Sequence, residues 1–248
     1  MTKRIGMIVP SSNTTAEPVT TALTAGLYPK VSLHYTRIGV TQISLDAKSQ
    51  QQFELSNMLA AARLLADAGV DVIAWNGTSG AWRGVEADHA ICDAITRELS
   101  VPATTGTIAQ LEAFRAYGVT RFAMAVPYLP SVRDLMLTVY RSAGFECVSS
   151  ALLKSPIEIN SAFAKVPADE IRDLVARSDV AEAEGIAIIC TNFPAAWLVE
   201  ELETRHGKPI FDSTILVAWH ALRLAGVTDA VPGWGRLMRE PAGGAIVP

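Results

Sequence analysis

The sequence predicts an α/β protein built from two pseudo-symmetric Rossmann-like halves, each with a parallel four-stranded sheet and with the active site in the cleft between them. Short apolar runs alternate with helical patterns along all 248 residues, which is typical of βαβ units. The order of patterns also repeats. A loop of small hydroxyl and amide residues begins at Gly77, 67 residues after Pro10, and a similar loop begins at Cys190, 63 residues after Pro127.

The first half is expected to run through residues 1–106. Its first strand ends in Ile8-Val9-Pro10, and Thr14-Thr15-Ala16-Glu17 has the capping-box pattern that starts a helix. Apolar runs and helical periodicity place the other elements. We expect strands at 4–10, 31–37, 71–76 and 101–104, and helices at 15–25, 50–68, 84–98 and 108–116.

The second half is expected to cover residues 107–212. Glycines at 118, 144, 207 and 226 stand where helices commonly end. A last helix within 213–248 is expected to cross back and complete the first half, followed by a loop at 232–236. We expect strands at 121–127, 145–149, 185–190 and 209–211, and helices at 130–143, 168–183, 195–204 and 213–224.

Composition excludes several classes of function. Half of the residues are apolar, the mean hydropathy is +0.25 and the net charge is −4, so nucleic acid is not expected as a partner. No apolar stretch is long enough to span a membrane, and the N-terminal apolar run is too short for a signal peptide. Three cysteines without metal spacing suggest free thiols and a cytoplasmic protein. Four scattered histidines and the absence of a dinucleotide or Walker loop predict no metal and no cofactor.

Four loops follow strands whose carboxyl ends should meet in the cleft, and open parallel sheets bind ligands there. These loops are 11–14, 76–80, 127–131 and 190–194. Free backbone N–H groups at strand-to-helix junctions suit an anion. The sequence therefore predicts a site for a small carboxylic or dicarboxylic acid, with the oligomeric state left open.

Cys190 is the predicted catalytic residue. It ends an apolar strand, and Thr191, Asn192 and Pro194 after it form a helix-start sequence. A thiol at a helix N-terminus has a lowered pKa and can exchange a proton. The alternative is a buried core cysteine, which is the interpretation we prefer for Cys92 and Cys147.

The predicted substrate-binding residues are small or polar side chains at the strand ends: Asn13, Gly77, Thr78, Ser79, Tyr128, Asn160 and Thr191. Each has a structural alternative, such as an ordinary loop residue or, for Asn13, a helix cap. Their joint placement is what favours the binding interpretation. The five tryptophans are expected to be packing residues, and Asp212 and His220 to be structural.

These residues resemble the aspartate/glutamate racemase superfamily of cofactor-independent enzymes, in which Cys190-Thr191 looks like the second cysteine motif. Within it the chain is most similar to arylmalonate decarboxylase, over nearly its whole length from 5–10 to 233–237. Gly77-Thr78-Ser79, followed by Arg83-Gly84, resembles the loop of that enzyme that binds two oxyanions, and 218–226 its last helix. The resemblance implies that Thr78, Ser79 and Tyr128 bind a carboxylate that becomes an enediolate, and that Cys190 delivers the proton.

Two features are instead similar to maleate cis–trans isomerase. Residues 10–14 and Asn160 look like its carboxylate-binding residues, yet that enzyme carries a cysteine where this chain has Gly77. This mixture favours a smaller or more polar diacid over an aryl substrate. An ectoine-utilisation protein of the same superfamily is another possible match.

The function predicted from the sequence is decarboxylation of a substituted malonate, without a cofactor, through an enediolate that Cys190 protonates on one face. The alternatives are a maleate-type isomerase, with Cys190 adding to a double bond, a racemase of a small acid, or a non-catalytic carboxylate-binding protein. Glycine at 77 implies a single proton donor, so Gly77→Cys is expected to confer racemisation.

Overall fold

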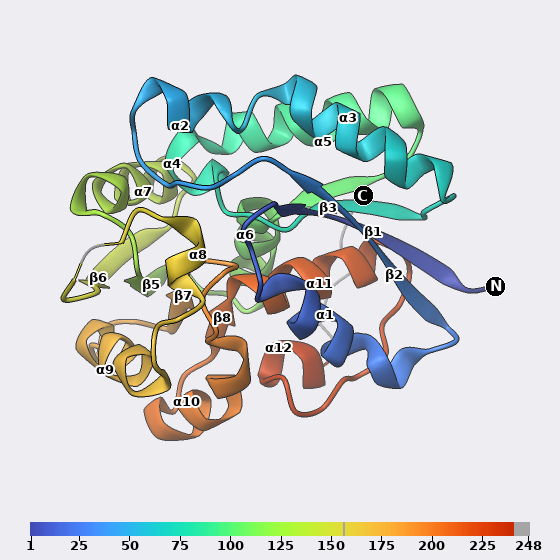
Figure 1. Cartoon of the computed structure of the whole chain (residues 1–248). Helices are drawn as coiled ribbons and strands as arrows, with labels where there is room; N and C mark the ends of the chain where they lie inside the picture. The colour runs from blue at the N-terminus through green and yellow to red at the C-terminus, as the bar shows by residue number, and fades with distance from the viewer. Residues whose placement is uncertain (156, 241–248) are drawn as a thin grey trace.

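Two four-stranded sheets form the centre of the computed structural model, which describes residues 1–155 and 157–240 (Figure 1). Their strand orders are β2-β1-β3-β4 and β6-β5-β7-β8, and all neighbouring strands are parallel. The two halves thus repeat one topology, and the predicted pseudo-symmetric α/β fold is confirmed. The exact division at residue 106 stays a prediction.

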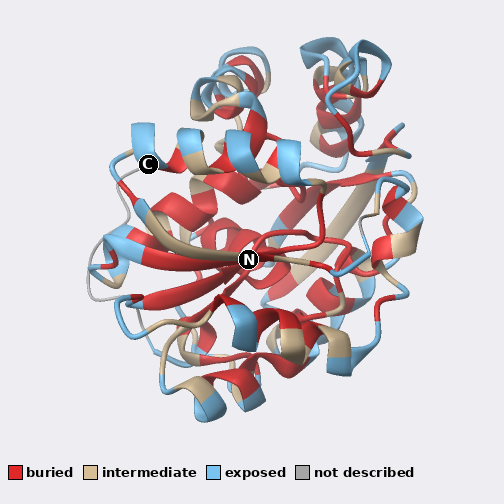
Figure 2. Ribbon diagram, turned by 90° about the vertical axis from the view of Figure 1, so that its left-hand side faces the viewer, coloured by how far each residue is buried: buried red, intermediate tan, exposed pale blue. Residues whose placement is uncertain are grey.

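The central strands are buried on both faces, as parallel strands covered by helices require. Every residue of β3 and β7 is buried, whereas the edge strand β2 is half-buried along most of its length (Figure 2). The first sheet consists of β1 (Lys3–Pro10), β2 (Val31–Ile38), β3 (Val72–Trp75) and β4 (Ala103–Thr105). The second consists of β5 (Arg121–Val126), β6 (Glu146–Leu152), β7 (Gly185–Ile188) and β8 (Ile210–Asp212).

Helices cover both faces of each sheet. In the first half, α3 and α5 lie on one side of the sheet and α1 and α11 on the other (Figure 1). These helices are α1 (Ala16–Thr24), α2 (Ala47–Gln51), α3 (Leu55–Asp67), α4 (Gly80–Arg83), α5 (Val85–Leu99) and α6 (Gly106–Ala116), with a 3₁₀ turn η1 at Ala25–Leu27. In the second half they are α7 (Pro130–Ser142), α8 (Asn160–Phe163), α9 (Ala168–Ser178), η2 (Ala196–Leu198) and α10 (Val199–His206).

The last long helix, α11 (Ser213–Leu224), follows the final strand of the second sheet and packs against β3 and β4 of the first. Asp212 caps it by accepting hydrogen bonds from the backbone N–H groups of Thr214 and Ile215, at 3.0 and 3.1 Å. The expected loop at 232–236 is partly wrong, because Arg236 begins the short helix α12 (Arg236–Arg239). The predicted segment 213–248 also includes residues 241–248, which lie outside the described residues.

The single helix expected at 50–68 is wrong, because the chain forms α2 and α3 with a break at residues 52–54. Asp46 caps α2 by accepting from the Ser49 N–H at 2.9 Å. At the break, the side chain of Phe53 turns inward and is buried. Similarly, the helix expected at 84–98 is preceded by the one-turn α4, and Gly84 separates the two with a φ of 107° that favours glycine.

The first helix begins where the sequence indicates, yet its cap differs from the expected capping box. Thr15 makes no side-chain capping bond. The Asn13 side-chain oxygen instead accepts from the backbone N–H groups of Thr15 and Ala16, both at 2.9 Å. Asparagine is among the best residues for this role, and Asn13 therefore fixes the loop after β1.

Within residues 1–155 and 157–240, no helix is long and apolar enough to cross a bilayer. The same residues contain no group of three or more His, Cys, Asp and Glu side chains arranged to hold a metal ion.

Candidate active site

A small cavity lies where the strand-end loops of the two halves meet. Its volume of about 20 Å³ is close to what one water molecule needs. The first half supplies the loop after β3, and the second supplies the loops after β5 and β7 and the start of α8. Of the predicted site residues, those that line the cavity are Gly77, Thr78, Ser79, Tyr128, Asn160, Cys190 and Thr191.

Hydrogen-bond donors gather on one side of this cavity. The hydroxyl groups of Thr78 and Tyr128 lie 3.1 Å apart, and the Ser79 hydroxyl accepts from the indole N–H of Trp75 at 3.2 Å. Among the described residues, the backbone N–H groups of Thr78, Ser79 and Thr191 make no hydrogen bond. We call Thr78, Ser79, Tyr128 and the Thr191 amide the donor cradle. Such a set of fixed donors is suited to a carboxylate or to an enediolate.

The Gly77 carbonyl fixes the position of the cradle loop. It accepts a hydrogen bond from the Gly106 N–H at 3.1 Å, at the start of α6. A Cβ at Gly106 would lie 2.5 Å from that carbonyl oxygen, so only glycine permits this approach. The loop is thereby held to the rigid end of β4.

Cys190 is the one thiol that lines the cavity in the described part of the chain, and its side chain is 2 % exposed. Burial raises the pKa of Cys190 to about 12, although hydrogen bonds from the Tyr128 hydroxyl and the Asn192 and Phe193 amides oppose this shift. The expectation of a lowered pKa at a helix N-terminus is wrong. Residues 191–195 form turns, and α10 begins only at Val199. The thiol therefore carries its proton at neutral pH.

Tyr128 is also a neutral donor. Burial raises its pKa well above the ordinary value, with a further contribution from the adjacent Cys190. Its ring is held edge-on by Trp82 and Phe163, at centroid distances of 5.5 and 5.4 Å. A tyrosine fixed in this way keeps its hydroxyl directed at the cavity.

Asn13 does not line the cavity, but it contacts Thr191, which does. Its side-chain amide donates to the Thr191 hydroxyl at 3.1 Å, and that hydroxyl donates to the Asn76 carbonyl at 3.1 Å. Three strand-end loops are thus joined across the cleft. Because the Thr191 hydroxyl gives its one proton to the Asn76 carbonyl, its backbone N–H is the donor left for an anionic ligand.

Asn160 lines the cavity from the start of α8. Its side-chain amide donates to the Ser12 hydroxyl at 2.8 Å. Its backbone carbonyl accepts from the Asn192 side-chain amide at 2.6 Å. Asn192 also accepts from the Thr14 N–H at 3.0 Å. The sequence placed Asn192 only in a helix-start motif, whereas the structure shows that it connects the two halves.

Residues 41–43 and 158–160 come together beside the cavity, and we call this pair of segments the strap. Gln42 and Ile159 form an isolated antiparallel bridge. The Ile43 N–H donates to the Glu158 carbonyl at 2.8 Å, and the Asn160 N–H donates to the Thr41 carbonyl at 2.9 Å. Ile43 and Asn160 both line the cavity, so the strap forms part of its boundary.

An apolar wall also lines the cavity, and the sequence did not indicate it. It consists of Val40, Ile43, Phe53, Trp75 and Trp82. The two tryptophans are buried, as their expected packing role requires, yet they also line the cavity. Helical or strand periodicity cannot distinguish an apolar side chain in a core from one in a cavity wall, which explains the omission.

The expected effect of Gly77→Cys needs correction. A Cβ at Gly77 would lie 2.3 Å from Trp75 Cζ2 and 2.4 Å from Cε2. Real Cβ atoms do not approach neighbours so closely, so a cysteine at this position first displaces the indole. The single substitution therefore does not simply add a second thiol.

Asp212 and His220 make the structural contacts expected of them. Asp212 caps α11, and the His220 ring nitrogen Nδ1 lies 2.7 Å from the Thr104 hydroxyl. Burial raises the pKa of Asp212 to about 7 and lowers that of His220 to about 4.

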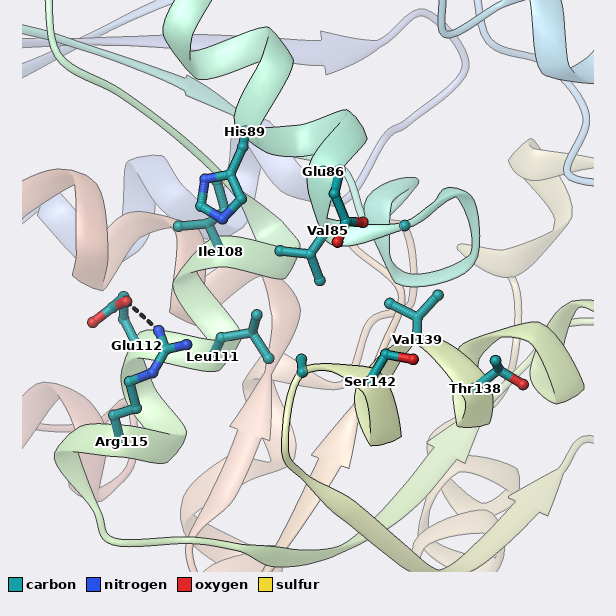
Figure 3. Close-up of a pocket in the computed structure, with 12 residues that line it drawn as sticks. Val85, Glu86, His89, Ile108, Leu111, Glu112, Arg115, Thr138, Val139 and Ser142 are labelled. Carbon is teal, nitrogen blue, oxygen red and sulfur yellow. Dashed lines mark hydrogen bonds and ion pairs between the residues drawn. The ribbon is translucent and has the colours of Figure 1, made fainter.

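A larger pocket of about 350 Å³ lies on the surface between α5, α6 and α7 (Figure 3). Two of its charged side chains, Glu112 and Arg115, pair with each other at 2.5 Å. It contains no predicted site residue and no thiol. Volume alone does not define a site, and the hydrogen-bond donors and the Cys190 thiol are in the smaller cavity.

The fold and the cavity define a two-lobed α/β protein in which one buried thiol faces a set of donors between the lobes. The chain matches the arylmalonate decarboxylase family over residues 5–238, and it belongs to that family. The resemblance found in the sequence is confirmed.

Individual relatives show two activities. The arylmalonate decarboxylase of Bordetella bronchiseptica is 29% identical over 243 residues, covering 96% of this chain and 98% of that protein. The maleate isomerase of Nocardia farcinica is 25% identical over 247 residues, covering 96% of each. A liganded arylmalonate decarboxylase mutant superimposes with a TM-score of 0.83 at 27% identity, covering 96% of this chain and 99% of that one. The chain is thus related to both decarboxylases and isomerases.

Proposed function

We propose that this protein is a cofactor-independent decarboxylase of a substituted malonate, with Cys190 as its proton donor. The observation that carries the proposal is the single protonated thiol beside the donor cradle, in which the backbone N–H groups of Thr78, Ser79 and Thr191 have no partner among the described residues. A thiol whose pKa is raised to about 12 is protonated at neutral pH, so it is a poor nucleophile there and it carries the proton that a strongly basic enediolate carbon can accept. In this proposal Asn13 does not bind the substrate. Its hydrogen bond to the Thr191 hydroxyl holds Thr191, and with it the Thr191 backbone N–H, in position.

In the proposed reaction, one carboxylate of the substrate lies in the donor cradle and the other lies against the apolar wall. The bond from Cα to the second carboxylate breaks, carbon dioxide leaves, and the electron pair moves into the first carboxylate to give an enediolate. Thr78, Ser79, Tyr128 and the Thr191 amide stabilise this added charge more strongly than they do the starting acid, which lowers the barrier. Cys190 then donates its proton to Cα, and solvent reprotonates the thiolate.

The size and the lining of the cavity also indicate a class of substrate. Its small volume favours a compact diacid, as the sequence suggested, whereas the wall of Val40, Ile43, Phe53, Trp75 and Trp82 favours an apolar substituent rather than a polar one. A malonate with a small alkyl or flat apolar group on Cα matches both features.

The alternative is a maleate-type isomerase, and Asn160 is the observation that favours it. The Asn160 side chain, whose amide donates to the Ser12 hydroxyl, is a second polar group at the cavity, which suits a diacid held at both ends. In that reaction Cys190 adds to the double bond as thiolate, which requires its pKa to fall when the substrate binds.

The test is a panel of substituted malonates and maleate, with carbon dioxide release and product analysis in deuterium oxide. The proposal predicts one carbon dioxide per substrate and one deuteron at Cα. With a single thiol, the product of a prochiral malonate is one enantiomer. Fumarate from maleate without carbon dioxide from any malonate would establish the isomerase instead.

A further inference from the structure

Trp75 occupies the space next to the donor cradle that a side chain at residue 77 would otherwise fill. It is the last residue of β3 and is 1 % exposed. Its ring atoms Cζ2 and Cε2 lie 2.3 and 2.4 Å from the position of a Cβ at Gly77. Phe53 packs edge-on against it at a centroid distance of 6.4 Å. The indole is therefore held in one place.

The hydrogen bond that Trp75 makes has a fixed direction. An indole nitrogen can only donate, so the Ser79 hydroxyl must be the acceptor of the 3.2 Å bond from Trp75 Nε1. Ser79 then has its own proton left to donate. In the described part of the protein this hydroxyl donates to no other group, and Ser79 lines the cavity with Thr78 and Cys190.

We infer that Trp75 is a positioning residue of the carboxylate site. Its N–H holds the Ser79 hydroxyl as an acceptor, so that the serine proton is directed at the bound carboxylate. Its ring also excludes any side chain from residue 77 and leaves Cys190 as the one proton donor. This inference rests on the proposed function, because it gives Trp75 an effect on a bound acid.

The second tryptophan of the same wall offers a matched comparison. Trp82 also lines the cavity, yet its indole nitrogen has no hydrogen-bond partner among the described residues. Replacing either tryptophan by phenylalanine removes similar apolar surface. Only Trp75→Phe also removes a hydrogen bond to a cradle hydroxyl.

The test is a pair of double-mutant cycles with Ser79→Ala, measured as kcat on a malonate that the protein decarboxylates. Trp75→Phe is expected to lower kcat by about tenfold, the size of one ordinary hydrogen bond. In the Ser79→Ala background the same change is expected to have an effect below about twofold, because interacting residues are not additive. Trp82→Phe is expected to act independently of Ser79. Equal effects of Trp75→Phe in both backgrounds would overturn the inference.

A spectroscopic measurement separates this inference from the proposed function. The indole N–H signal of Trp75, assigned in ¹⁵N-labelled protein through its contact with Phe53, is expected to shift in Ser79→Ala and on addition of malonate. If no malonate is decarboxylated but both shifts occur, the proposed function fails and the positioning role stands. A Trp75 signal that is unchanged in Ser79→Ala overturns the positioning role, whatever the activity and even if Trp75→Phe does not fold.

Discussion

At the scale of single residues, Thr78 and Ser79 connect the fold most directly with the proposed chemistry. Both follow β3, both are buried, and both face the cavity that contains Cys190. Thr78 is paired with Tyr128, whereas Ser79 is held by Trp75. Each hydroxyl is therefore held in position before a ligand binds. A donor that is fixed in advance can stabilise negative charge that develops on the ligand.

We expect Thr78→Ala and Ser79→Ala each to lower kcat by about 10²–10³, the usual loss when one oxyanion donor is removed. Carbon dioxide release from a malonate measures this effect. Thr138→Ala serves as the control, because Thr138 is exposed on α7 and bonds only to the Asp134 carbonyl. If both cradle variants kept the wild-type rate, a carboxylate could not lie where we place it.

Gly77→Cys is expected to lower stability by about 1–3 kcal/mol, as overpacking of a tight site does, because its Cβ overlaps the Trp75 ring. In Gly77→Cys/Trp75→Leu the smaller side chain makes room, and a second thiol is expected to exchange the α-proton of a chiral product acid. Thermal unfolding and deuterium uptake with chiral analysis measure the two effects. A single variant that is as stable as wild type and racemises quickly would contradict this account.

At the scale of elements, the strap and the break between α2 and α3 shape the entrance to the site. The side chain of Gln52, at the break, accepts from the Thr41 N–H at 2.7 Å and donates to the Gln42 carbonyl at 3.0 Å. Gln52 thus fixes the first-half segment of the strap, whose backbone bonds to residues 158–160 reach the second half. The break also places Phe53 in the cavity wall.

Gln52→Ala is expected to loosen the strap and to raise the Kd for malonate by about tenfold, because it removes hydrogen bonds of about 0.5–1.5 kcal/mol each. Isothermal titration calorimetry measures this change. The exposed neighbour Gln51 makes no side-chain hydrogen bond within the described residues, so Gln51→Ala is the matched control. Equal Kd values for the two variants would show that the closed strap does not contribute to binding.

The elements also show what a sequence can and cannot predict. The strands and most helices could be predicted because apolar periodicity and helix-ending glycines are local features. The break at 52–54 could not, since it depends on Gln52 bonding to Thr41 and on Phe53 turning into a distant cavity. For α1 the sequence left two caps open, the capping box at 14–17 and Asn13, and only the backbone geometry decides in favour of Asn13.

At the scale of the whole molecule, the repeated strand order explains why the sequence could predict that most of the candidate residues lie together at one cavity. Parallel strands end on one edge of a sheet, so loops at corresponding places in two similar halves meet in the cleft. The pKa of Cys190 could not be predicted, because it depends on burial by residues from both halves. The role of Trp75 could not either, since the close approach to Gly77 appears only in three dimensions.

Buried carboxyl groups are expected to make the stability of the molecule depend on pH. Burial raises the pKa of Asp212 to about 7 and that of Asp88 to about 6. Both groups keep their protons to higher pH in the folded state than in the unfolded state. Their contribution to the free energy of unfolding is therefore complete below about pH 4 and is lost as pH rises towards 7.

Asp212→Asn is expected to make the fall in Tm between about pH 5 and 8 shallower than in wild type, while its oxygen still caps α11. Thermal unfolding across this range measures the difference. His220, with its pKa lowered to about 4, gives the opposite slope, so the comparison is between variant and wild type. Identical pH profiles would mean that Asp212 is not a buried acid of this kind.

The central claim is that Cys190 supplies the proton to the enediolate. The most direct measurement is the rate of carbon dioxide release from a malonate by wild type, Cys190→Ala and Cys147→Ala, with circular dichroism to verify the fold. Cys147 is half-buried and its thiol bonds to the Ser149 carbonyl, away from the cavity. The account predicts a loss of about 10²–10⁴ for Cys190→Ala, the usual contribution of a general acid, and no loss for Cys147→Ala. A folded Cys190→Ala protein that decarboxylates at the wild-type rate would contradict it.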